Sequence, residues 1–286
     1  MEDVARRFNM AVKHLGDIAQ KLLVFGGPYS NLAATMALQA RAAELDIPAE
    51  RIICTGDVVA YCAEPEQTVE LIREWGIHVV MGNCEEALAF SEADCGCGFA
   101  EGSSCSTLAV TWYQYADRGV TAGQRRWMRG LLRSIEFEAG GRLFKVVHGS
   151  LSSINEFVFA SSDAVVKREQ IRAAGVDAII GGHCGIPFGQ DIDNLFWLNA
   201  GVIGMPANDG GSQVWYMMID PAADGLQVSW HRLDYDHATS GRTTMAAGMT
   251  EYGQALLDGR WPSTDILPDA ESRQCGQPLD LPTLYL

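Results

Sequence analysis

The sequence predicts an α/β fold, and three features of the 286-residue chain indicate it. Short apolar runs end repeatedly in polar turns that contain glycine. Segments with helical periodicity stand between the first of these runs, as they do in parallel β-α-β units. After residue 194 the apolar runs are separated only by turn-forming residues, which favours an antiparallel second half.

The first predicted element is an amphipathic helix in residues 1–20. Its apolar residues recur every three or four positions, as they do on one face of a helix: Val4, Phe8, Val12, Leu15 and Ile18. A strand at residues 22–25 follows and ends at glycine, and a helix is predicted over residues 31–44 with Ser30 or Asn31 as its N-cap.

The strand-turn-helix order then repeats along the chain. Further strands are predicted at residues 51–54, 78–81, 143–147 and 178–180, with a helix at 65–75. The later runs, at residues 195–198, 214–219 and 226–230, are the antiparallel strands. Beyond residue 236 we expect helix as far as residue 257, and then a proline-rich tail that wraps the surface.

Composition narrows the classes of protein. With 48% hydrophobic and 20% charged residues, the chain is typical of globular proteins. It contains no membrane-spanning run and no secretory leader pattern, so a cytoplasmic protein with no membrane partner is expected. Its eight cysteines are expected as free thiols or metal ligands, since a core of this size needs no disulfides. Because the net charge is -15, nucleic acid is not an expected partner. A small phosphorylated molecule is the expected ligand, and a homo-oligomer is also compatible with the sequence.

Four polar residues follow strand-like runs and together offer one carboxylate, one amide oxygen and two imidazoles: Asp57, Asn83, His148 and His183. Because parallel strands deliver such residues to one edge of a sheet, this set can close around one divalent metal ion. Mixed oxygen and nitrogen donors suit zinc, manganese or iron better than calcium or magnesium. The alternative is that each residue only caps a turn or satisfies a local hydrogen bond.

The blocks that contain these residues resemble the signatures of the calcineurin-like metallophosphoesterases. The family's Gly-Asp, Gly-Asn-His-Asp/Glu, His-Gly and Gly-His-x-His motifs have ordered counterparts: Gly56-Asp57, Gly82-Asn83-Cys84-Glu85, His148-Gly149 and Gly182-His183-Cys184-Gly185. Residues 199–206 and 231–236 also look like family segments. The resemblance, to a divergent bacterial-type member, extends over about residues 20–265.

This resemblance implies a two-sheet β-sandwich flanked by helices, with a metallophosphoesterase-like domain in residues 21–236 and a C-terminal helix and tail in residues 237–286. It also implies that Asp57, Asn83, His148 and His183 are the ligands of the family's second metal. The ligands that belong only to the first metal are absent, because their positions hold Gly27, Tyr29 and Gly185. The resemblance therefore implies a mononuclear site or a site with other donors.

Cysteine replaces the family's catalytic acid, because Cys84 stands where the family has histidine. A thiol is a weaker proton donor than imidazole at neutral pH but a good soft metal ligand. Cys84 and His148 are the predicted catalytic residues. The alternative for Cys84 is that it is a small buried residue that only fills space in the core. Cys95, Cys97 and Cys105 are candidate extra thiolate ligands, or else inert or redox-sensitive thiols. Tyr29 and Asn31 are the candidate substrate-binding residues.

The predicted function is hydrolysis of a phosphomonoester or phosphodiester with one divalent transition metal ion (Zn, Mn or Fe). A catalytically impaired protein that binds or senses a ligand or metal is the alternative, because the first metal site and the acid are both missing. A further alternative is a thiolate-assisted metal enzyme with different chemistry.

Overall fold

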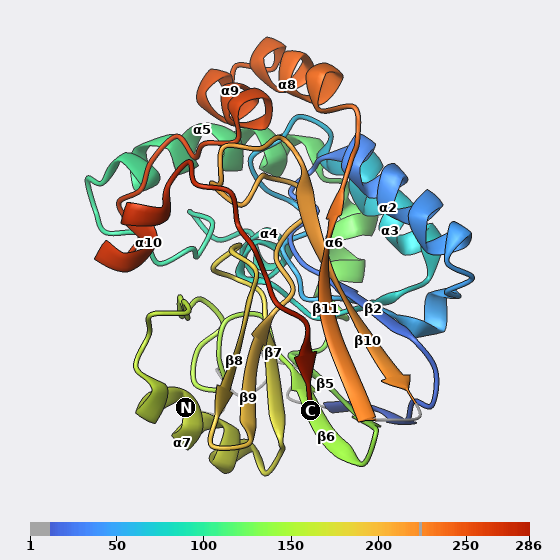
Figure 1. Cartoon of the computed structure of the whole chain (residues 1–286). Helices are drawn as coiled ribbons and strands as arrows, with labels where there is room; N and C mark the ends of the chain where they lie inside the picture. The colour runs from blue at the N-terminus through green and yellow to red at the C-terminus, as the bar shows by residue number, and fades with distance from the viewer. Residues whose placement is uncertain (1–11, 223–224) are drawn as a thin grey trace, which may run out of the picture.

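Alternating side chains of strand β2 (Leu22–Phe25) separate the two main cores of the protein. Leu22 and Val24 point into an apolar layer shared by two sheets, whereas Leu23 and Phe25 pack under helices. This is the period of two expected of a strand that is buried on both faces. The computed structural model describes residues 12–222 and 225–286, and Figure 1 shows the two sheets side by side with helices around them.

Within the described residues, both sheets are mixed and have six strands. One contains, in spatial order, β1 (Val12–Asp17), β5 (Ser134–Ala139), β6 (Arg142–Val146), β7 (Ala178–Gly181), β9 (Leu195–Asn199) and β8 (Phe188–Ile192). The other contains β12 (Leu284–Tyr285), β11 (Gly225–Leu233), β10 (Val214–Ala222), β2, β3 (Ile52–Cys54) and β4 (His78–Val79). The predicted two-sheet sandwich is confirmed.

Helices cover the outer faces of both sheets. On the sheet that contains β2 these are α2 (Leu32–Glu44), α3 (Pro65–Trp75), α4 (Asn83–Phe90), α5 (Ser104–Gly119) and α6 (Ala122–Arg129). On the other sheet α7 (Ala164–Ala174) packs through Ile171 against Ile179 and Trp197. The remaining elements are the short 3-10 helix η1 (Ala49–Arg51) and the C-terminal α8 (His237–Ala246), α9 (Thr250–Asp258) and α10 (Asp269–Gln274).

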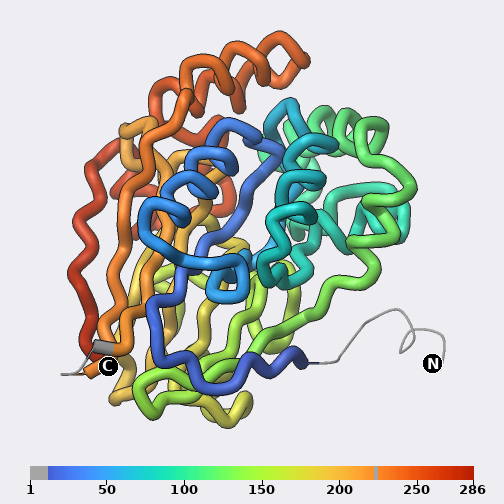
Figure 2. Tube along the Cα trace, turned by 90° about the vertical axis from the view of Figure 1, so that its right-hand side faces the viewer, coloured from blue at the N-terminus to red at the C-terminus, as the bar shows by residue number. Residues whose placement is uncertain are grey.

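The predicted N-terminal helix is wrong over Val12–Asp17, which form β1 instead. This strand pairs in parallel with β5 at the edge of its sheet, and Figure 2 shows it running along that edge. Most side chains of β1 are exposed, so apolar and polar residues do not alternate along it as they do in a half-buried strand. Its apolar residues are instead spaced three apart, as on one face of a helix. Residues 1–11 of the predicted helix lie outside the described residues.

The C-terminal segment returns across the molecule to the sheet edge. After α10 it runs down beside β11, where β12 adds an antiparallel strand at the edge (Figure 1). Upstream of α10, residues 261–266 lie against the carboxyl-end loops of both sheets. Within the described parts of the chain, no helix is long and apolar enough to cross a bilayer.

Candidate metal centre

Four potential metal ligands lie at the loops that follow strands of both sheets. Asp57 follows β3, Asn83 is the first residue of α4, His148 follows β6 and His183 follows β7. All four are buried, with at most 7% of their surface exposed. The two sheets thus each supply two ligands to one point, as expected for parallel strands that end at a common edge.

The distances between the donor atoms are those of a coordination shell. The Nε2 atom of His148 lies 3.0 Å from Asn83 Oδ1, 3.1 Å from His183 Nδ1 and 3.2 Å from Asp57 Oδ2. His183 Nδ1 and Asp57 Oδ2 are 4.0 Å apart. Donors on a tetrahedral zinc ion, with bonds of about 2.0 Å, are separated by roughly 3.3 Å. The arrangement therefore fits one transition metal ion.

Neighbouring groups turn the lone pairs of these donors inward. His148 Nδ1 lies 2.7 Å from the carbonyl oxygen of Thr55, so its N–H donates there and leaves Nε2 as an acceptor. Asn83 Nδ2 donates to the carbonyl oxygen of Cys95 at 2.9 Å, which points Oδ1 towards His148. Several acceptor atoms that face one another repel unless a proton or cation lies among them, and a metal ion satisfies them all.

Electrostatics within the protein couple the carboxylate and the imidazoles. Burial would raise the pKa of Asp57, but the charge and hydrogen bond of His148 outweigh it and lower the pKa below its usual value. Burial likewise opposes protonation of His148, and Asp57 outweighs it and raises the pKa of that imidazole. Burial and then the charge of His148 lower the pKa of His183 to about 3, so His183 stays neutral and able to bind a metal ion.

Glu85 is a buried residue of this site that the sequence reasoning did not single out. Its Oε2 accepts hydrogen bonds from the N–H groups of Asp57 and Gly82, at 2.7 and 3.0 Å, and its Oε1 accepts one from Val59 at 3.2 Å. Burial, and then the charge of Asp57, raise its pKa to about 7. Glu85 is the third residue of α4, the position at which a glutamate often accepts a hydrogen bond from the N-cap backbone. This position after Gly82-Asn83 was the sequence signal that could have identified it.

Close packing of two loops makes glycine necessary at two positions. Asp57 has φ +57°, and Gly56 before it has φ +101°, so the turn is left-handed at both residues. A Cβ atom on Gly56 would lie 2.7 Å from the backbone nitrogen of Gly82, and one on Gly82 would lie 2.3 Å from Asp57 Oδ1. Because these two positions have no side chain, the loops pack closely and leave room for the Asp57 carboxylate to point into the candidate metal centre.

Aromatic side chains surround the positions to which the sequence resemblance assigns the ligands of a first metal. The three corresponding positions are Gly27, Tyr29 and Gly185. A Cβ atom on Gly27 would lie 2.5 Å from Cζ of Tyr29, so the tyrosine ring occupies the room that a side chain at position 27 would need. A Cβ atom on Gly185 would lie 3.5 Å from the ring of Trp261 and 3.7 Å from the Tyr29 hydroxyl.

Cys84 lies at the edge of the metal centre. Its backbone N–H donates to Asp57 Oδ1 at 3.2 Å, and its sulfur lies 3.5 Å from Asn83 Nδ2. Burial, and then the charges of Asp57 and Glu85, raise the pKa of its thiol well above the usual value. The thiol therefore keeps its proton near neutral pH unless a cation is present, and its catalytic or ligand role stays a prediction.

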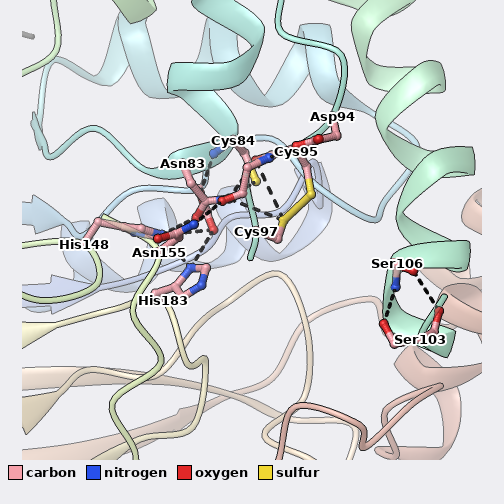
Figure 3. The surroundings of a disulfide bond; sticks show 12 residues. Asn83, Cys84, Asp94, Cys95, Cys97, Ser103, Ser106, His148, Asn155 and His183 are labelled. Atoms are coloured by element: carbon pink, nitrogen blue, oxygen red, sulfur yellow. Dashed lines mark hydrogen bonds and ion pairs between the residues drawn. A yellow bond between two sulfur atoms is a disulfide. The ribbon is translucent and has the colours of Figure 1, made fainter. Parts of the chain in front are cut away.

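Cys95 and Cys97 form a disulfide beside Asn83 (Figure 3). These two cysteines are therefore not free thiols in this structure, and their role as thiolate ligands in the reduced form stays a prediction. Gly96 between them has φ +63°, a left-handed conformation that glycine adopts readily. Cys105 is free but lies at the start of α5 against Ser263, apart from the other two.

Asn31 has hydrogen-bond partners within the protein. Its Oδ1 accepts from the N–H of Ala34, as the N-cap of α2, and from the hydroxyl of Ser240. Its Nδ2 donates to the carbonyl oxygen of Gly204 at 3.1 Å. Asn31 is only 1% exposed, so the structure shows it joining α2 to α8, and its predicted contact with substrate stays a prediction.

Comparisons with known proteins agree with the fold. The profile of the calcineurin-like phosphoesterase superfamily domain matches residues 29–222. Comparison with curated proteins gave no significant match. A solved metallophosphoesterase from Sphaerobacter thermophilus is similar, with 22% identity and a TM-score of 0.66 over 85% of this chain and 100% of that one. A hypothetical protein from Pyrococcus horikoshii OT3 has 16% identity and a TM-score of 0.71 over 84% and 99%.

Proposed function

Because this chain belongs to the calcineurin-like phosphoesterase superfamily, we propose that it hydrolyses phosphate esters with one divalent transition metal ion. The ligands would be Asp57, Asn83, His148 and His183. The observation that supports the proposal is the convergence of their donor atoms, whose separations from His148 Nε2 are 3.0–3.2 Å. When bound, such an ion would polarise the phosphoryl oxygens and activate water.

In the proposed reaction water attacks phosphorus, the ester P–O bond breaks, and the alcohol leaves with a proton. The protein residues hold the geometry for this step. Thr55 and Cys95 orient two of the ligands through their carbonyl oxygens, and Glu85 fixes the backbone of Asp57. The single site lacks the two-metal clamp on the attacking and leaving oxygens, so we expect slower turnover than in dinuclear relatives.

Turnover of two generic substrates tests this proposal. Metal-loaded protein should hydrolyse 4-nitrophenyl phosphate or bis(4-nitrophenyl) phosphate, and His183→Ala should lose at least about 100-fold of kcat/KM because a ligand is gone. His14→Ala is the matched control, since His14 lies on β1 with 69% of its side chain exposed. Equal activity of wild type and His183→Ala would refute the assignment.

A ligand-binding protein without turnover is the second candidate, and the residue at position 84 favours it. The thiol of Cys84 stands where the family has an acid histidine, and its raised pKa makes it a poor proton donor at neutral pH. In that case the metal-loaded protein would bind phosphate analogues and hydrolyse neither ester.

A further inference from the structure

An apolar pocket opens directly beside the proposed metal centre. His183, one of the proposed ligands, lines it together with Tyr29 and Gly185, which occupy positions of the missing first site. The other side is formed by α5, through Leu108, and by the C-terminal segment, through Trp261. One of the four proposed ligands thus lines the pocket, which places the pocket next to the proposed metal centre.

The walls of the pocket are mostly aromatic and are held rigidly. Tyr61 stacks on Tyr252 and meets Tyr29 edge to face, with ring centroids 4.8 Å apart in both pairs. Opposite them, the ring of Phe157 lies 4.2 Å from the ring of His183. Such contacts between rings keep the side chains in place without a bound molecule.

Trp261 closes the pocket from the C-terminal segment. Its indole N–H donates to the carbonyl oxygen of Pro206 at 2.7 Å, and its backbone N–H donates to Asn208 Oδ1 at 2.9 Å. Two residues on from Ser263, Asp265 accepts a hydrogen bond from the N–H of Ser104 at the start of α5. The segment is thus fixed to both the loop after β9 and helix α5, so the wall it forms is part of the folded structure.

The charge and size of the pocket limit what it can hold. None of its lining residues is lysine, arginine, aspartate or glutamate among the residues that the structure describes. Its cavity volume is about 60 Å³, whereas one water needs roughly 10–15 Å³. There is room for a group of a few heavy atoms, so part of an aromatic ring can enter it, but a nucleoside cannot. The chain's net charge of -15 further disfavours polyphosphates.

We propose that the substrate is a phosphate ester of a compact apolar alcohol, such as a phenol or benzyl alcohol, whose ring enters the pocket lined by Tyr29, Phe157 and Trp261. This inference rests on the proposed function for the placement of the phosphoryl group at Asp57 and His183. The positions that hold first-metal ligands in the family carry or adjoin aromatic side chains here. We infer that this change alters substrate specificity, because the space beside them would bind the alcohol part of the ester.

Binding of two phosphonates that cannot be hydrolysed tests the inference. Calorimetry on the metal-loaded full-length protein should show phenylphosphonate binding at least about tenfold more tightly than methylphosphonate, because the ring is removed from water. Leu108→Trp, which fills the pocket from α5, should reduce this ratio to less than about threefold. Val110→Trp is the matched control, since Val110 lies on the same helix with 55% of its surface exposed, and it should keep the ratio.

The outcomes separate this inference from the proposed function. Ring-selective binding without ester turnover would refute hydrolysis and leave the pocket assignment in place. Equal affinities for the two phosphonates, or no binding of phenylphosphonate, would overturn the inference even if esters are hydrolysed. If Leu108→Trp does not fold, Ser263→Phe fills the same pocket from the C-terminal segment and should abolish the preference for phenylphosphonate. If a folded variant with a filled pocket keeps that preference, the inference is also overturned.

Discussion

The carboxylate of Glu85 accepts a 2.7 Å hydrogen bond from the backbone N–H of Asp57. Asp57 has φ +57°, a conformation that is unfavourable for a residue with a side chain. The same carboxylate binds the N–H groups of Gly82 and Val59, so one buried side chain joins the two loops that carry Asp57 and Asn83. Glu85 thus holds together two loops of the proposed metal centre, although it donates no ligand atom there.

Replacing Glu85 with alanine should lower the free energy of unfolding of metal-free protein by about 2–4 kcal/mol, because three buried N–H groups lose their acceptor. Metal affinity should fall by roughly 10- to 100-fold as Asp57 is released. Urea unfolding and metal titration measure the two effects. Glu74→Gln, at an exposed position of α3, is the control and should change neither. Unchanged metal affinity in a folded Glu85→Ala protein would show that Glu85 does not position Asp57.

Gly27 and Tyr29 should be energetically coupled, because a Cβ atom on Gly27 would lie 2.5 Å from the tyrosine ring. Gly27→Ala should destabilise the wild-type protein more than it destabilises Tyr29→Ala, with a coupling energy of about 1 kcal/mol or more. Val202 also crowds position 27, so part of the loss should remain in the double variant. A double-mutant cycle from urea unfolding measures the coupling, and strictly additive effects would contradict it.

Lys167 should make stability depend on pH in the alkaline range. It is 1% exposed, donates to the carbonyl oxygen of Ala160 and to Gln190, and burial lowers its pKa to about 8. The unfolded value is about 10.4, so between these pH values the unfolded chain binds more protons. The lysine's contribution to stability therefore rises with pH across this interval and is constant below it.

Comparison with Lys167→Met isolates this contribution. The free energy of unfolding of wild type minus that of the variant should rise between about pH 8 and 10.4 and stay flat from pH 6 to 7. Urea unfolding at a series of pH values checks it. A flat difference for Lys167→Met would mean that its pKa is not lowered by folding.

Strand ends were the part of the structure that sequence reasoning could predict. Short apolar runs followed by polar turns indicated where Asp57, Asn83, His148 and His183 lie. Strands β3 and β7 are buried along their whole length, whereas β4 is half-buried and β6 alternates buried with more exposed residues. Parallel pairing then brought their carboxyl ends together. The same reasoning failed for β1, an exposed edge strand without the alternation that marks a half-buried one.

Contacts between distant parts of the chain were beyond sequence reasoning. Trp261 reaches Gly185 and lines the same pocket as Tyr29, from a segment that in sequence is only a proline-containing turn. The carbonyl oxygens of Thr55 and Cys95 orient two ligands, and any residue type supplies a carbonyl. The sequence therefore predicted which side chains meet at the metal centre, whereas their orientation and the pocket beside them required the structure.

Metal titration by calorimetry, with elemental analysis of the loaded protein, tests most directly that the centre holds one ion. We expect one equivalent in wild type, one in Cys84→Ser and one in the control His14→Ala. In His183→Ala the affinity should fall at least about 100-fold, because one of the four ligands is removed. Two equivalents in wild type, falling to one in Cys84→Ser, would contradict the mononuclear centre and show a dinuclear site completed by cysteine.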